Sequence, residues 1–315
     1  MEAPAAIELD GQYRQLREEA GVLDRSDRAK LVVSGSEGTD YLQGQLTNDV
    51  EALAVDAGCY SALLDRKGHM QADMRVLRLA EDRIWIDAEG DAREAVLRHL
   101  RMYSIGRDVE IIDLGEECAL LSFIGPLALE EARDGGPSPP SGSVRPIDGR
   151  EDSWRVVTET GYDVICPRAD ADLRRGDTPQ VVEEAAEILR IERGVPRFGR
   201  EMTAETMPAE AGIVERAVSF TKGCYIGQET VARLHYKGKP NRHLRGLRLD
   251  APVTAGAKLR LGDREVGTLG SSCLSPAFGP IGLAIVRREA EPGAILAIEG
   301  GGAATVVELP FGETS

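Results

Sequence analysis

The octapeptide KGCYIGQE, from Lys222 to Glu229, has the residue types and spacing that most readily suggest chemistry. Its surroundings predict a strand at 217–220 before it and a helix at 228–235 after it. A glycine turn that leads into a helix leaves backbone N–H groups unpaired, and together with Lys222 they favour the thiolate of Cys224. The segment is therefore typical of a reactive thiol, although a small buried thiol at a tight turn is the commoner arrangement.

The other four cysteines lie on apolar strands or beside turns, where we expect them to pack: Cys59, Cys118, Cys166 and Cys273. They are far apart, and the chain has no C-x-x-C motif, which favours neither a disulfide framework nor a zinc site. The N-terminus MEAPAAIELD has no basic start and no apolar run, as a signal peptide would have. We therefore expect a cytoplasmic protein with no bound metal.

Glu192 lies on the apolar face of a predicted helix at 179–193. Wound at about 100° per residue, this helix places Glu192 in the same arc as Ile188 and Leu189. A carboxylate there, in the last helical turn, is disfavoured by desolvation and by the helix dipole. It needs a partner, which is either a ligand or a nearby arginine: Arg190, Arg193 or Arg197.

Asp73 belongs to a predicted strand at 70–79 in which apolar and polar residues alternate. The alternation places Asp73 on the polar face, beside Arg75. From the residues alone, a solvated aspartate that pairs with this arginine is the simpler interpretation.

A basic segment stands out in an otherwise acidic chain. The chain has 38 Lys and Arg against 53 Asp and Glu, a net charge of −15, which disfavours nucleic acid as a general partner. Between Val231 and Leu249 there is no acidic residue and there are six basic ones: Arg233, Lys237, Lys239, Arg242, Arg245 and Arg248. The segment is either a solvated basic face or a binding site for an acidic tail or partner.

The predicted elements are short and mixed. Besides 179–193 and 228–235, helices are expected at 12–20, 38–46 and 91–102; strands are expected at 30–33, 84–87, 109–112, 119–123, 154–158 and 162–166, besides 70–79 and 217–220. Glycine, proline and serine predict a loop at 135–150, and short strands alone follow residue 243. Helices and strands in separate blocks, followed by a small all-β barrel, indicate an α+β protein.

The stretch KGCYIGQETVAR resembles the signature of the folate-binding YgfZ family, relatives of the glycine-cleavage T-protein, an aminomethyltransferase. Similar blocks span nearly the whole chain: LQGQLTNDVEAL, YSALLDRKGHMQADMRVL, LRIERGVPRFGREM and VGTLGSSCLSPAFGPIGLAIVRRE. The resemblance implies a three-lobed fold, with two α+β lobes around a central folate-binding hole and a C-terminal β-barrel. The lobes would occupy residues 1–242, the second at about 48–149, and the barrel 243–315.

The resemblance also implies a function and a site. It implies an accessory protein that binds tetrahydrofolate and helps to assemble or repair iron–sulfur enzymes; the alternative is a folate-dependent aminomethyltransferase, and whether the chain is an enzyme stays open. Expected partners are reduced folate, with or without a polyglutamate tail, and iron–sulfur client enzymes or assembly proteins. No membrane partner is expected, and nucleic acid is a disfavoured partner, since Tyr236 is the one aromatic residue within the basic segment. In T-proteins the glutamate that matches Glu192 pairs with the pterin, and the aspartate that matches Asp73 lies near the reactive part of folate, so the resemblance implies these roles for both residues. The implied catalytic residues are Cys224, Lys222 and Asp73, and the implied folate-binding residues are Glu192, Asp73, Tyr225, Gln228 and Arg233.

Overall fold

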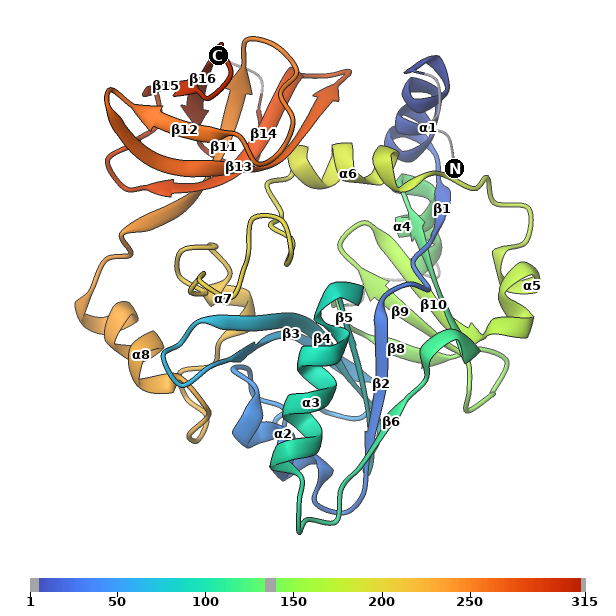
Figure 1. The fold of residues 1–315 in the computed structure, drawn as a ribbon. Coiled ribbons are helices and arrows are strands. Elements are labelled where there is room, and N and C mark those ends of the chain that lie inside the picture. Colours follow the sequence, from blue (N-terminus) through green and yellow to red (C-terminus); the bar gives the residue numbers. More distant parts are fainter. Residues whose placement is uncertain (1–5, 134–139, 313–315) are drawn as a thin grey trace. The chain divides into compact units, whose positions relative to one another are not determined.

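A computed structural model describes residues 6–133 and 140–312 (Figure 1). The chain forms two units, each discontinuous in sequence. The first comprises the residues up to 64, then 71–186 and 216–226; the second comprises 65–70, 187–215 and the residues from 227 onward.

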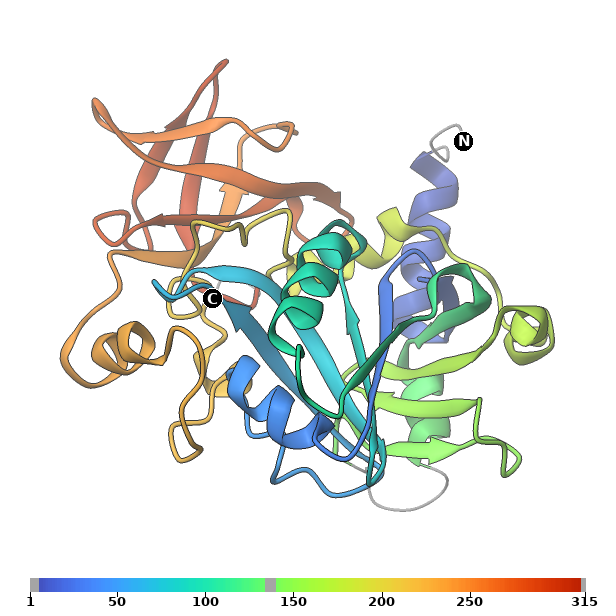
Figure 2. The ribbon, with the colours of Figure 1, turned by 60° about the horizontal axis from the view of Figure 1, so that its bottom comes forward.

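The first unit contains two five-stranded sheets. One has the order β3-β4-β5-β2-β6, with β2 (Ala29–Ser34), β3 (Ala57–Leu64), β4 (Met70–Ala80), β5 (Arg83–Ala88) and β6 (Glu110–Asp113). Its helices α2 (Gly38–Gln45) and α3 (Arg93–Tyr103) lie on one side of the sheet, as Figures 1 and 2 show, and a 3₁₀ turn, η1 (Gly90–Ala92), precedes α3. The sheet carries Asp73 on β4, next to β3 on one side and β5 on the other.

The second sheet of this unit has the order β1-β7-β10-β9-β8, with antiparallel neighbours throughout. Its strands are β1 (Gly21–Asp24), β7 (Cys118–Ile124), β8 (Val144–Pro146), β9 (Trp154–Thr158) and β10 (Gly161–Pro167). The short helical elements around it are α1 (Ala6–Glu18), η2 (Gly115–Glu117), α4 (Pro126–Arg133), η3 (Arg168–Asp170) and α5 (Ala171–Arg175). Trp85 and Leu77 of the first sheet pack against Trp154 and Ile165 of the second, so the two sheets share a core.

The second unit contains a closed barrel with the order β11-β14-β13-β12-β15-β16. Its strands are β11 (Arg242–Leu249), β12 (Lys258–Leu261), β13 (Arg264–Ser275), β14 (Gly279–Arg287), β15 (Ile295–Ile298) and β16 (Ala303–Val307). Alternate residues such as Leu247, Val286 and Val306 fill the barrel. Three helices complete the chain: α6 (Glu183–Glu192), α7 (Val214–Ala217) and α8 (Gln228–Lys237). The predicted α+β class and the C-terminal barrel are confirmed.

Three local predictions are wrong. The helix predicted at 179–193 begins at Glu183, because Pro179 and Val181 exchange backbone hydrogen bonds with Val22 of β1. The strand predicted at 217–220 is absent: α7 ends at Ala217, and the chain continues without regular structure. The loop predicted at 135–150 contains β8 in its second half, while its residues 135–139 lie outside the described part of the chain.

The lobe boundaries expected from the resemblance, and its central hole, stay predictions. No helix in the described part of the chain has both the length and the apolar character needed to span a bilayer.

Candidate functional site

Lys222 is held inside the first unit by backbone carbonyl groups. Its Nζ donates hydrogen bonds to the carbonyl oxygens of Gln43 and Leu46, both at 2.6 Å, and of Asn48 at 3.0 Å. Gln43 lies in the last turn of α2, Leu46 directly follows the helix, and Asn48 lies in the loop after it. The last carbonyls of a helix have no partner within it, so the lysine satisfies groups that the helix leaves open. Burial lowers the pKa of Lys222 to about 8. The three N–H groups of the ammonium are thus used by the backbone, which makes this lysine an anchor.

Tyr225 packs against the same anchor. Its ring lies 5.1 Å from Nζ of Lys222, which is a cation–π contact. The side chain is buried, which raises its pKa to about 12, and its hydroxyl has no hydrogen-bond partner among the described residues. Cys224 lies between these two buried residues and is exposed. The motif therefore buries its lysine and its tyrosine and presents its thiol to solvent.

Further hydrogen bonds fasten segment 216–226 to the loop after α2. The Thr47 hydroxyl donates to the carbonyl of Ala217 at 2.6 Å, and the Asn48 side chain donates to the carbonyl of Arg216 at 3.0 Å. The backbone N–H of Ser219 donates to the carbonyl of Thr47 at 3.0 Å. These bonds position the backbone that leads to Cys224.

Gly227, within the cysteine motif and directly before α8, adopts the left-handed conformation with φ +86°. Glycine adopts this conformation without steric cost, which explains its place in the motif. The predicted glycine turn into a helix is confirmed, with α8 beginning at Gln228 as expected.

Cys224 is the exposed cysteine of the chain, whereas the other four are buried or half-buried. Burial raises the pKa of Cys59 and of Cys273 to about 12, and that of Cys118 and of Cys166 to about 11. At neutral pH these four thiols stay protonated.

Asp73 contacts a tyrosine and not the arginine expected from strand alternation. The hydroxyl of Tyr60, on β3, donates to Oδ2 of Asp73 at 2.7 Å. Arg75 binds Asp87 at 2.8 Å and Asp163 at 2.6 Å, so the solvated Asp73–Arg75 pair is wrong. Burial raises the pKa of Asp73. Its Oδ1 is buried and has no hydrogen-bond partner among the described residues.

Glu192 is the last residue of α6 and is only 4% exposed, which confirms its expected place on the buried face. The Ser275 hydroxyl donates to its Oε1 at 2.6 Å. The same hydroxyl accepts hydrogen bonds of 3.0 Å from the backbone N–H groups of Ala277 and Phe278. Arg190, one of the arginines considered as its partner, binds Glu187 and Glu201.

The basic segment divides into paired and unpaired cations. On β11, Arg242 lies 3.4 Å from Glu210, Arg245 lies 3.4 Å from Glu308, and Arg248 donates to the carbonyl of Gly312 at 2.8 Å. On α8 and just after it, three exposed cations have no ion pair with any described residue: Arg233, Lys237 and Lys239. An anion that binds this segment would therefore meet Arg233, Lys237 and Lys239 as its unpaired cations.

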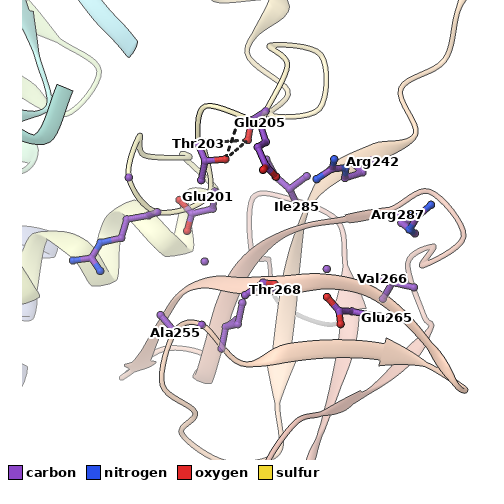
Figure 3. A pocket seen from close by; sticks show the side chains of 17 residues that line it. Glu201, Thr203, Glu205, Arg242, Ala255, Glu265, Val266, Thr268, Ile285 and Arg287 are labelled. Atoms are coloured by element: carbon purple, nitrogen blue, oxygen red, sulfur yellow. Dashed lines mark hydrogen bonds between the residues drawn. The ribbon is translucent and has the colours of Figure 1, made fainter. Parts of the chain in front are cut away.

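A pocket of about 710 Å³ lies inside the second unit, between residues 199–206 and the barrel. Figure 3 shows Glu201, Thr203 and Glu205 on its loop side and Glu265 and Thr268 on its barrel side. None of the implied catalytic or folate-binding residues lines it. Sequence reasoning missed this pocket, and it also missed Tyr60 and Ser275, whose contacts become visible only in the folded chain.

The family comparisons match both ends of the chain. The GCVT N-terminal domain matches residues 5–133, and the glycine cleavage T-protein C-terminal barrel domain matches residues 242–312. A Rubrobacter xylanophilus protein named aminomethyltransferase is 29% identical over 322 residues, which cover 96% of this chain and 86% of that protein. An uncharacterized protein from Haemophilus influenzae is 31% identical over 222 residues, 67% of this chain and 68% of its own length.

A solved structure extends the likeness to the fold. The glycine cleavage system aminomethyltransferase T from Bartonella henselae matches with a TM-score of 0.86 at 25% identity, over 97% of this chain and 90% of that one. Two domain models at opposite ends and one structure over nearly the full length agree. The chain belongs to the superfamily of the glycine cleavage T-protein.

Proposed function

We propose that this chain binds tetrahydrofolate and that folate-dependent aminomethyl transfer is its first candidate activity. Two of the relatives compared with it carry the name aminomethyltransferase. The observation that carries the proposal is Asp73, a half-buried aspartate with a raised pKa, whose Oδ1 is buried and accepts no hydrogen bond from any described residue. An orphaned buried carboxylate oxygen is costly unless a ligand completes it.

Glu192 suits the pterin end of the ligand. A carboxylate has about four acceptor positions, and Ser275 uses one of them. A carboxylate can accept two parallel hydrogen bonds from the N–H edge of a pterin, which is the pairing proposed for Glu192. The Ser275 contact fixes the carboxylate before the ligand arrives, which lowers the ordering cost of binding.

Asp73 suits the reactive end. When bound, tetrahydrofolate supplies the nitrogen that accepts the one-carbon unit. Burial raises the pKa of Asp73, which favours a carboxyl group that can exchange a proton with a nearby amine. In this proposal Asp73 orients the reacting amine and moves its proton, while Tyr225, Gln228 and Arg233 contribute to holding the folate.

A turnover assay with an aminomethylated carrier protein and tetrahydrofolate tests this activity. We expect methylenetetrahydrofolate and ammonia from the wild type and a loss of at least 10²-fold in rate for Asp73→Asn, which is the usual scale for a general acid or base. Wild-type protein that binds tetrahydrofolate but gives no turnover would exclude the transferase reaction and leave the folate site in place.

A second candidate function rests on Cys224, which is exposed on a segment that Lys222 and Tyr225 hold in place. The motif resembles the signature of the YgfZ family, and this resemblance favours an accessory role for iron–sulfur enzymes, with these client enzymes or their assembly proteins as partners. Complementation of a bacterial strain that lacks its YgfZ-type protein tests it. We expect the wild type to restore iron–sulfur enzyme activity and Cys224→Ala to fail. Full complementation by Cys224→Ala would exclude a role for this thiol.

A further inference from the structure

Tyr60 is the hydrogen-bond partner of the aspartate proposed to act on folate. Its hydroxyl lies 2.7 Å from Oδ2 of Asp73, and the guanidinium of Arg216 lies 5.2 Å from the centre of its ring. Burial and the neighbouring Asp73 carboxylate hold the pKa of Tyr60 well above its usual value. The hydroxyl therefore stays protonated throughout the neutral pH range and donates a hydrogen bond to Asp73.

The other charged groups near Asp73 come from two neighbouring strands. Ala88 of β5 pairs with Met74 of β4 and with Ala29 of β2, and both pairs are antiparallel. The residue after Ala88 therefore lies in one row across the sheet with the residue before Met74 and the residue before Ala29. These residues are Asp73, Arg28 and Glu89.

Arg28 and Glu89 act on Asp73 in opposite directions. Arg28 favours the ionised form of Asp73, and Glu89 opposes it. Arg28 is itself bound to Glu89 and, at 3.1 Å, to Asp87. The arginine is thus held by its own acidic partners. The hydrogen bond from the Tyr60 hydroxyl and the backbone of Asp73 itself act directly on the Asp73 carboxylate, and Tyr60 is the side chain that orients it.

This arrangement makes the two oxygens of Asp73 different. Oδ2 is occupied by the tyrosine, whereas Oδ1 is buried and unpartnered among the described residues. We infer that Tyr60 is a positioning residue, which holds Oδ2 so that Oδ1 is the oxygen left to meet the reacting amine of a bound reduced folate. The inference rests on the proposed folate site, and its effect on Asp73 can be measured without any ligand.

The test follows the titration of Asp73 by carbon-13 NMR of aspartate-labelled protein, with Asp73→Asn to assign the signal. A hydrogen bond from a hydroxyl stabilises the carboxylate form and lowers its pKa. Tyr60→Phe removes the hydroxyl and keeps the ring over Arg216, so we expect the midpoint of Asp73 to move to higher pH. Incorporation of 3-fluorotyrosine, a more acidic phenol and hence a stronger donor, should move it to lower pH in the unmutated sequence.

Tyr162→Phe is the matched control. The hydroxyl of Tyr162 also donates a hydrogen bond to a carboxylate, that of Glu131, at 2.9 Å, and the guanidinium of Arg155 lies over its ring. It lies on the other sheet, so its loss should leave the Asp73 midpoint unchanged. An unchanged midpoint in both Tyr60→Phe and fluorinated protein would overturn the inference.

Calorimetry with tetrahydrofolate across the same pH range separates the two proposals. If Tyr60→Phe shifts the pH dependence of tetrahydrofolate affinity by the same amount as it shifts the titration midpoint of Asp73, the positioning role is supported. Wild-type protein that binds no tetrahydrofolate would overturn the proposed function and the ligand-facing role of Oδ1, whatever the titration shows.

Discussion

The hydroxyl of Ser275, at the end of β13, donates a 2.6 Å hydrogen bond to Oε1 of Glu192, at the end of α6. The serine hydroxyl also accepts hydrogen bonds from two backbone N–H groups, which fix its orientation. Both residues are buried. The hydrogen bond from Ser275 therefore fixes the orientation of the buried Glu192 carboxylate.

Glu192→Gln should weaken tetrahydrofolate binding. The amide keeps the shape of the side chain but loses the charge and one acceptor, at a cost of about 1.5–3 kcal/mol for a charge-assisted hydrogen bond. Calorimetry measures this difference directly. Glu184→Gln, an exposed change on the same helix, is the control and should bind as the wild type does. Equal affinity of the Glu192→Gln variant and the wild type would remove Glu192 from the site.

Limiting iodoacetamide at pH 8 should label Cys224 before any other cysteine. The thiolate is the reacting form, and burial keeps the pKa of the other four between about 11 and about 12. Their labelling should accelerate only as the pH approaches those values. Mass spectrometry of peptides gives the order, and Cys224→Ala should lose the fast phase. Labelling of Cys273 at the same rate as Cys224 would contradict this assignment.

Lys222→Met should destabilise the protein by about 2–5 kcal/mol, because it leaves three backbone carbonyls without their donor. Urea unfolding, with the slope of the transition compared between variants, provides the measurement. Lys67→Met at an exposed lysine is the control and should stay within about 0.5 kcal/mol of the wild type. A similarly small effect at Lys222 would mean that the anchor is dispensable.

Polyglutamylated tetrahydrofolate should bind more tightly than the monoglutamate. The unpaired cations of the basic segment attract an acidic tail, and added salt should reduce the advantage because these groups are exposed. The double variant Lys237→Gln/Lys239→Gln should lower the affinity for the polyglutamate by roughly fivefold and leave the monoglutamate unaffected. Arg245→Gln, at a cation that already has an acidic partner, is the control. If tail length has no effect at low salt, the segment faces another partner.

The fold was predictable where periodicity was strong. Strand β9 has its predicted bounds, 154–158, and α2 differs from its prediction by one residue. The buried position of Glu192 followed from helical periodicity alone. The start of α6 could not be predicted in this way. Thr178-Pro179 is typical of a helix cap, but the backbone of residues 179–181 forms hydrogen bonds with Val22, more than 150 positions earlier in the chain. The residues around a helix start contain no information about a strand so distant in sequence that can bind their backbone.

The candidate site was predictable only in part, for a similar reason. Cys224 was recognised as distinctive from its neighbours in sequence, but Lys222 was expected to act on the thiol beside it. The structure shows that the lysine reaches residues 43–48 instead. Tyr60 could have been paired with Asp73 if β3 had been predicted, since the turn signal at 65–68 joins two adjacent strands there. Burial does not alternate along β3: its first four residues are half-buried and its last four are buried, so the strand has no period of two from which it could be predicted.

The return of segment 216–226 to the first unit has a consequence for synthesis on the ribosome. The chain leaves this unit at residue 186 and comes back 30 residues later with the donor and acceptor groups that satisfy Thr47, Asn48 and the end of α2. Because translation is vectorial, the first unit cannot acquire all of these bonds until Lys222 has left the exit tunnel. A nascent chain stalled after residue 186 should therefore be open to proteases near residues 43–48, and one stalled well beyond residue 226 should be protected there.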